Sequence, residues 1–195
     1  MNYVFLSPHF PPNWFNFCVR LKESGFNVLG LGDEPYDSLR AELRNSLTEY
    51  YRVENMHNYD QLVRAIGFFI WKYGKIDFIE SHNEYWLETE ANLRDDFNVN
   101  GYRKGNIEAI KRKSIMKRVF QVANIPVAPG QIAISFETAK DFAEKNGYPL
   151  IAKPDIGVGA YATYKIHDDQ ELFDFFTQKP DVTYFLECFI DGTII

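Results

Sequence analysis

Apolar positions in the first hundred residues follow two spacings, one typical of strands and one typical of helices. Short apolar runs at residues 3–7, 27–31 and 76–79 predict strands, and helical i, i+3, i+4, i+7 spacing predicts helices over residues 14–21 and 59–73. Apolar strands that are joined by helices of this length are typical of a parallel sheet covered on both faces. Residues 1–104 are therefore expected to form a doubly wound, Rossmann-like α/β domain.

The pattern changes after residue 104, behind a stretch rich in glycine, lysine and arginine. The later elements are expected at residues 107–124 (helix), 130–134 (strand), 136–145 (helix), 150–153 (strand), 162–166 (strand), 171–178 (helix) and 183–188 (strand). Two consecutive strands separated by a glycine-containing turn predict a hairpin and hence an antiparallel sheet. Residues 105–195 are expected to form a second, α+β domain.

Composition excludes several classes of partner. The chain has 46% hydrophobic and 25% charged residues, which is enough apolar material for a folded core. Its 21 lysines and arginines against 27 acidic residues give a net charge of -6, and no basic stripe with interleaved aromatic residues occurs, so no nucleic acid partner is expected. The longest uncharged apolar run, residues 65–71, is far shorter than the roughly 20 residues that span a bilayer, so no membrane partner is expected either.

The two cysteines indicate a cellular compartment. Cys18 and Cys188 lie near opposite ends of a chain that opens directly into a strand, without a basic leader-like segment. This usage fits a reducing cytoplasm in which both thiols are small core residues.

A lysine at the end of a buried strand is the first candidate for chemistry. Lys153 ends the strand at 150–153, and a turn that contains Gly157 and Gly159 follows it. A fixed ammonium group beside backbone N–H groups that glycines leave accessible is suited to a polyphosphate. The alternative is that Lys153 is simply a solvated strand end.

Two further segments join this one. Upstream, Lys113 begins a helix that leads to a strand framed by Pro126 and Pro129; downstream, an apolar strand carries Glu187 and ends at Gly192. The three segments, in this order, resemble the ATP-grasp superfamily. The resemblance covers nearly the whole chain, because the first domain takes the place of the N-terminal α/β domain of that family.

The resemblance implies a nucleotide site and a reaction. It identifies Lys113 and Lys153 as phosphate contacts, and Glu187 and Ile190 as the hinge that recognises adenine through main-chain groups. The phosphate-covering loop, with its backbone N–H groups, corresponds to Gly157, Val158, Gly159 and Ala160. It implies ATP with Mg²⁺ as cofactors and small carboxylate and amine molecules as substrates, with the carboxylate activated as an acylphosphate.

Several positions depart from the family pattern. Arg112 stands where many members have an acidic residue, Ala160 where serine or glycine is common, and Cys188 where lysine or an acidic residue is common. The metal-holding acidic residues and the substrate-orienting arginine of the family lie beyond the hinge, so the chain is expected to be an N-terminal part that lacks the second lobe. Such a part is expected to be inactive alone and to expose a cleft face that favours pairing with a second copy.

The first domain offers a second polar cluster. His9 follows the first strand, and His82, Asn83 and Glu84 follow the strand at 76–79, so all four lie at carboxyl ends of parallel strands, where ligands bind. They are expected to line the acceptor side of the cleft; the alternative is that they only satisfy loop backbones. No two histidines have ligand spacing on one element, so no metal site is expected in this chain.

Three functions remain in competition. An ATP-dependent carboxylate–amine ligase agrees best with the segments above. A nucleotide sensor or scaffold without turnover would keep the same lysines. A Rossmann-type cofactor or sugar enzyme would need a glycine-rich turn after the first strand, and residues 7–10 are Ser-Pro-His-Phe.

Overall fold

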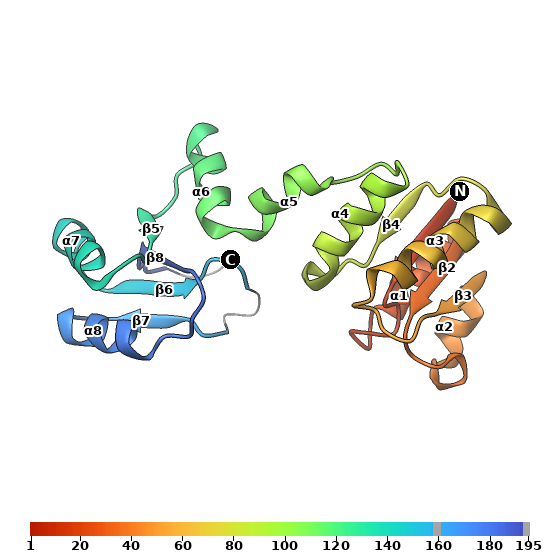
Figure 1. Cartoon of the computed structure of the whole chain (residues 1–195), viewed down its shortest axis with the longest axis horizontal. Coiled ribbons are helices and arrows are strands. Elements are labelled where there is room, and N and C mark those ends of the chain that lie inside the picture. The colour runs from red at the N-terminus through yellow and green to blue at the C-terminus, as the bar shows by residue number, and fades with distance from the viewer. Residues whose placement is uncertain (158–160, 193–195) are drawn as a thin grey trace. The chain divides into compact units, whose positions relative to one another are not determined.

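A computed structural model describes residues 1–157 and 161–192 (Figure 1). The chain divides into two compact units, residues 1–107 and 108–195, each with its own hydrophobic core. The first is called unit 1 and the second unit 2. Within the described residues, no helix has the length and apolar character needed to cross a membrane.

Unit 1 is built on a four-stranded parallel sheet. Its strands are β1 (Asn2–Leu6), β2 (Asn27–Gly32), β3 (Glu49–Arg52) and β4 (Phe78–Glu80), in the spatial order β3-β2-β1-β4. The helices are α1 (Phe15–Glu23), α2 (Ala41–Ser46), α3 (Tyr59–Tyr73) and α4 (Leu87–Asp96), with 3-10 turns η1 (Tyr36–Ser38) and η2 (Glu84–Trp86). The predicted doubly wound sheet is confirmed.

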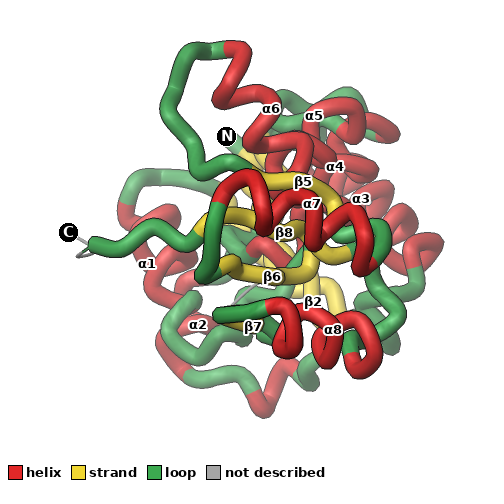
Figure 2. The backbone as a smooth tube through the Cα atoms, turned by 90° about the vertical axis from the view of Figure 1, so that its left-hand side faces the viewer, coloured by secondary structure: helices red, strands yellow, loops and turns green. Residues whose placement is uncertain are grey.

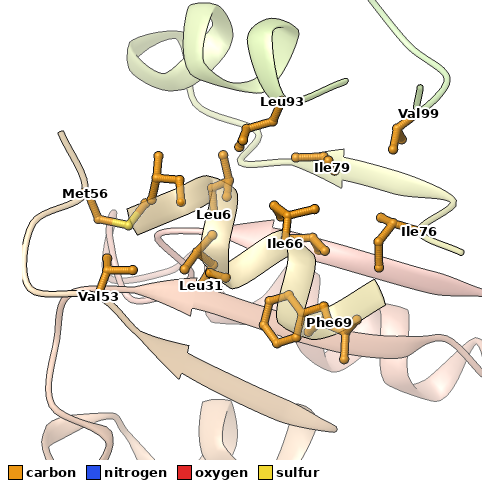
Figure 3. Packing of buried hydrophobic residues seen from close by; sticks show 14 residues of the cluster. Leu6, Leu31, Val53, Met56, Ile66, Phe69, Ile76, Ile79, Leu93 and Val99 are labelled. Carbon is orange, nitrogen blue, oxygen red and sulfur yellow. The ribbon is translucent and has the colours of Figure 1, made fainter. Parts of the chain in front are cut away.

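Alternation along β1 explains how both faces of this sheet are covered. Val4 and Leu6 pack with Ile66 and Phe69 of α3 and with Leu93 of α4 on one face (Figure 3). On the other face, Tyr3 and Phe5 pack with Cys18 of α1 and Leu43 of α2. Because successive side chains of a strand point to opposite faces, a nearly continuous apolar strand is buried on both sides.

Unit 2 contains the predicted antiparallel sheet. Its strands are β5 (Gly130–Ile132), β6 (Leu150–Pro154), β7 (Tyr164–Ile166) and β8 (Tyr184–Cys188), in the order β5-β8-β6-β7. Its helices are α6 (Lys113–Val122), α7 (Phe136–Asn146) and α8 (Asp169–Gln178), while α5 (Lys104–Lys111) contains the division between the units. Helices α7 and α8 begin at side-chain caps, Ser135 and Asp168, and Gly147 ends α7.

The two faces of the unit 2 sheet differ in character. Leu150, Ala152 and Leu186 are buried in one core with Ala139 of α7 and Leu172 of α8. Helices α7 and α8 lie beside the strands in Figure 2. The strand register pairs Lys153 with Phe185 and Ile151 with Glu187. Paired residues share a face, so Lys153 and Glu187 stand together on the face opposite the α7 and α8 core.

Two expectations from the sequence are wrong. The helix expected over 107–124 is two helices, because Arg112 has an extended backbone (φ -90°, ψ 116°) between α5 and α6. Cys18 is buried as expected, whereas Cys188 is only half-buried.

Candidate functional site

The start of α6 is anchored by a carboxylate from the end of β6. The buried Asp155 carboxylate accepts hydrogen bonds from the Ser114 backbone N–H (2.8 Å) and hydroxyl (3.0 Å) and from Arg112 Nη1 (3.4 Å). The unpaired N–H groups of a helix start favour such an anion, here supplied from another element rather than from the local sequence. Asp155 thereby fixes the position of Lys113.

Main-chain hydrogen bonds complete this junction. The Lys113 N–H donates to the Asp155 carbonyl (3.0 Å), and the Asp155 N–H donates to the Thr183 carbonyl (2.9 Å), just before β8. The Lys113 ammonium donates to the Gly157 carbonyl (3.1 Å), which stands at the start of the expected phosphate-covering loop. The three segments that carry the resemblance are thus joined at one end of unit 2.

A second cluster lies on the open face of the unit 2 sheet, the face opposite the α7 and α8 core. The Glu187 carboxylate of β8 forms ion pairs with Lys153 of β6 through Oε1 and with Lys117 of α6 through Oε2. Lys117 also donates to the Ala128 carbonyl (3.1 Å), and its ammonium lies 5.5 Å from the centre of the Phe185 ring. One carboxylate is therefore shared by two ammonium groups.

Burial and charge act in opposite directions on this carboxylate. Burial alone would raise the pKa of Glu187, because a low-dielectric surrounding disfavours the charged form. The hydrogen bonds and charges of Lys117 and Lys153 outweigh burial and hold the pKa below its usual value. Glu187 is therefore ionised at neutral pH, and the cluster carries one net positive charge.

Of the expected nucleotide residues, Lys113 and Gly157 lie in the first cluster, and Lys153 and Glu187 lie in the second. Glu187 is only 9% exposed and is therefore a buried carboxylate. Its main chain lies in the central strand β8, and its side chain carries the ion pairs. Ile190 is 69% exposed, and Val158, Gly159 and Ala160 lie outside the described residues.

Lys117 was not predicted from the sequence. It follows Lys113 by one helical turn, which places both lysines on one side of α6, and this spacing is the only signal that pointed to it. The signal is weak, because lysines at this spacing are common on solvated helices. The strand register and the placement of α6 together show that Lys117 meets a buried carboxylate.

In unit 1, the expected acceptor residues contact other residues of the same unit. His9 Nε2 lies 3.7 Å from Asp33 Oδ1, and His82 Nε2 lies 3.0 Å from the Tyr3 hydroxyl. The Asn83 side chain accepts a hydrogen bond from the Tyr85 backbone, at the start of η2, which includes Glu84. A role in substrate binding stays a prediction.

His82 is exposed, but aromatic neighbours shield part of its ring and its pKa lies below the usual value. Its ring stacks on Phe17 with centroids 4.5 Å apart, and burial lowers the pKa of His82, opposed by the charge of Glu80. A neutral imidazole can accept a proton or a hydrogen bond through one nitrogen. Across residues 1–157 and 161–192, no three His, Cys, Asp or Glu side chains come together as a metal site.

Residues 112–193 match the family described as the ATP-binding domain of the carbamoyl-phosphate synthase L chain. Two curated relatives are also similar to this chain. The chain is 26% identical over 108 residues to a carbamoyl phosphate synthase large chain of Caldanaerobacter subterraneus, covering 53% of this chain and 10% of that protein. It is 29% identical over 116 residues to an L-arginine-specific L-amino acid ligase of Bacillus subtilis, covering 60% of this chain and 28% of that protein.

Solved structures share the fold across both units. The N5-carboxyaminoimidazole synthetase of Staphylococcus aureus, complexed with ADP, has a TM-score of 0.73 at 14% identity and covers 97% of this chain and 48% of its own. The biotin carboxylase domain of the Hydrogenobacter thermophilus 2-oxoglutarate carboxylase, in complex with MgADP, has a TM-score of 0.71 at 21% identity, with 91% and 42% coverage. The chain spans less than half the length of each of these relatives. The predicted resemblance is confirmed at the level of the fold, and residues 112–193 match an ATP-binding domain.

Proposed function

We propose that this chain is the ATP-binding front half of a ligase that activates a carboxylate with ATP and passes it to an amine. The observation that carries the proposal is the junction at Asp155, which ties the segment of Lys113 to the end of the strand that holds Lys153. Both lysines belong to a unit that matches an ATP-binding domain. The name of the L-amino acid ligase relative supports an amine acceptor.

The chemistry needs charge to be stabilised on a moving phosphoryl group. A carboxylate oxygen attacks the γ-phosphorus, the bond to the β–γ bridging oxygen breaks, and ADP leaves with that oxygen. The amine nitrogen then attacks the acyl carbon, and the carbon–oxygen bond to phosphate breaks to release inorganic phosphate. Ammonium groups held in place before the nucleotide arrives stabilise the developing charge without reorganising.

Each residue has a proposed part in that site. Lys113 and Lys153 contact the phosphates, and the backbone N–H groups of residues 157–160 cover them. Glu187 and Ile190 recognise adenine through main-chain groups, and the proposed part of His9, His82, Asn83 and Glu84 of unit 1 is to bind the acceptor substrate. The ADP and MgADP complexes of the structural relatives support a Mg²⁺-bound nucleotide. We assign no Mg²⁺ ligand in this chain, since the described residues hold no acidic cluster.

Removing either phosphate lysine is expected to weaken ATP binding about tenfold, in line with the roughly 1.5–3 kcal/mol of a hydrogen bond to a charged group. The variants are Lys113→Met and Lys153→Met, and the measurement is titration calorimetry with a non-hydrolysable ATP analogue and Mg²⁺. Methionine keeps an unbranched side chain of similar length and removes the ammonium group, with its charge and its hydrogen-bond donors.

The matched control is Lys140→Met. Lys140 is another ion-paired lysine of unit 2, 3.0 Å from Asp169 on α8, and has no place in the proposed site. Its variant is expected to bind the analogue as the unmodified chain does. Equal affinity in all three variants, or no binding by the unmodified chain, would contradict the proposed function.

A further inference from the structure

Glu187 is paired with two lysines, Lys117 and Lys153, and only Lys153 is a proposed nucleotide contact. A carboxylate paired with Lys153 alone would form a neutral pair on the open face of the sheet. Lys117 adds a second ammonium from α6, so the carboxylate is shared and one positive charge is left over. An extra positive charge matters most where water is partly excluded, and Glu187 is buried.

The two lysines are held unequally. The Lys117 side chain is 14% exposed, is fixed by a second acceptor, the Ala128 carbonyl, and comes from a helix whose start is anchored by Asp155. The Lys153 side chain is 25% exposed, and among the described residues Glu187 is its hydrogen-bonding or ionic partner. Of the two ammonium groups, Lys153 is therefore the one that can leave the carboxylate at lower cost.

We infer that Lys117 is a positioning residue of the nucleotide site. It stays paired with the Glu187 carboxylate, so that the Lys153 ammonium can leave this carboxylate and bind a nucleotide phosphate instead. The inference rests on the proposed function, because it presumes that Lys153 contacts phosphate. Lys117 itself need not touch the nucleotide. Its effect is to keep Glu187 neutralised after Lys153 has moved.

Removing Lys117 should turn Glu187 into a competitor. In Lys117→Met, a buried carboxylate retains a single cation, and separating that pair would leave an uncompensated buried charge, which is costly. Lys153 should then stay on Glu187, and nucleotide phosphate should bind more weakly. Removing the carboxylate charge as well, in K117M/E187Q, releases Lys153 and should recover binding.

The experiment compares four proteins by titration calorimetry with a non-hydrolysable ATP analogue and Mg²⁺: the unmodified chain, K117M, E187Q and K117M/E187Q. K117M is expected to bind about tenfold more weakly than the unmodified chain, and the double variant to recover most of that loss. Lys117→Arg keeps the charge and is expected to bind close to the unmodified chain. Thermal unfolding followed by circular dichroism identifies any variant that has lost its fold.

Each outcome decides between distinct alternatives. A merely structural role for Lys117 would leave K117M/E187Q at least as weak as K117M, and that result would overturn the inference while the proposed function stands. Unchanged affinity in a folded K117M would overturn it too. A chain that binds no nucleotide in any form would instead remove the proposed function, and the inference with it.

Discussion

Replacing Arg94 by methionine is expected to destabilise unit 1 by about 3–5 kcal/mol, the range for breaking a buried ion pair from one side. Arg94 is 1% exposed, and its guanidinium contacts Glu90 (3.0 Å) and Glu80 (2.7 Å). It also donates to the carbonyls of Ile79 (2.6 Å) and Tyr102 (3.1 Å). The variant leaves the buried Glu90 carboxylate without its cation and removes the guanidinium donor from two carbonyls.

Tryptophan fluorescence during urea denaturation measures this loss selectively. The three tryptophans of the chain, Trp14, Trp71 and Trp86, all belong to unit 1, so their signal follows the unfolding of this unit. The matched control is Arg103→Met, which removes a half-exposed pair with Asp95 (3.2 Å) and is expected to change stability far less. Equal losses in the two variants would contradict the role assigned to Arg94.

The same variant should respond to pH in a defined direction. Burial raises the pKa of Glu90, while the hydrogen bond from Ser81 and the charge of Arg94 lower it again. Without Arg94 the pKa should rise further, so the folded protein holds a proton that the unfolded chain releases. A group whose pKa is raised in the folded state contributes to folding stability at low pH, and this contribution is lost as pH rises. The loss of stability caused by Arg94→Met should therefore be larger at pH 8 than at pH 5.

Replacing Asp155 by alanine is expected to cost about 2–4 kcal/mol in unit 2, because it removes a helix cap and leaves the half-buried Ser114 hydroxyl without its acceptor. The carboxylate accepts from the Ser114 backbone and hydroxyl, and the side chain is 2% exposed. Without it the first turn of α6 should fray. Lys113 lies in that turn, so nucleotide affinity should fall with stability.

Hydrogen exchange of the amides at the start of α6 measures this directly, and faster exchange there is expected in D155A. The matched control is Asp168→Ala, which removes the exposed cap of α8, a hydrogen bond of 2.9 Å to the Glu171 N–H. It should loosen α8 and leave α6 unchanged. Normal protection of α6 in D155A would show that its start is anchored by something other than this carboxylate.

Periodicity predicted the elements whose packing is apolar. Helix α3 was predicted with its final bounds, residues 59–73, because its buried positions Leu62, Ala65, Ile66 and Phe69 are all apolar. Helix α4 was not predicted, because its buried face includes Glu90 and Arg94, which hide the spacing. Polar residues on a buried face are satisfied only by tertiary partners, which a pattern of apolar residues cannot indicate.

The same limit applies to the site. Lys113, Lys153 and Glu187 could be named from their segments, but the partner of the Glu187 side chain depends on the register of three strands and the placement of α6. The break at Arg112 also has a tertiary cause. The cap of α6 is Asp155, whose carboxylate accepts a hydrogen bond from the Ser114 amide, 41 residues away in the sequence. No sequence signal near residue 112 indicates this cap.

The central claim is that a nucleotide polyphosphate lies against Lys113 and Lys153. Adenosine diphosphopyridoxal tests it directly, because its aldehyde sits near the position of the γ-phosphate and forms an imine with a neighbouring lysine that borohydride fixes. Peptide mass spectrometry of the labelled chain should find the label on Lys113 or Lys153, and excess MgATP should prevent it. Label spread over exposed lysines such as Lys140, unaffected by MgATP, would contradict the account.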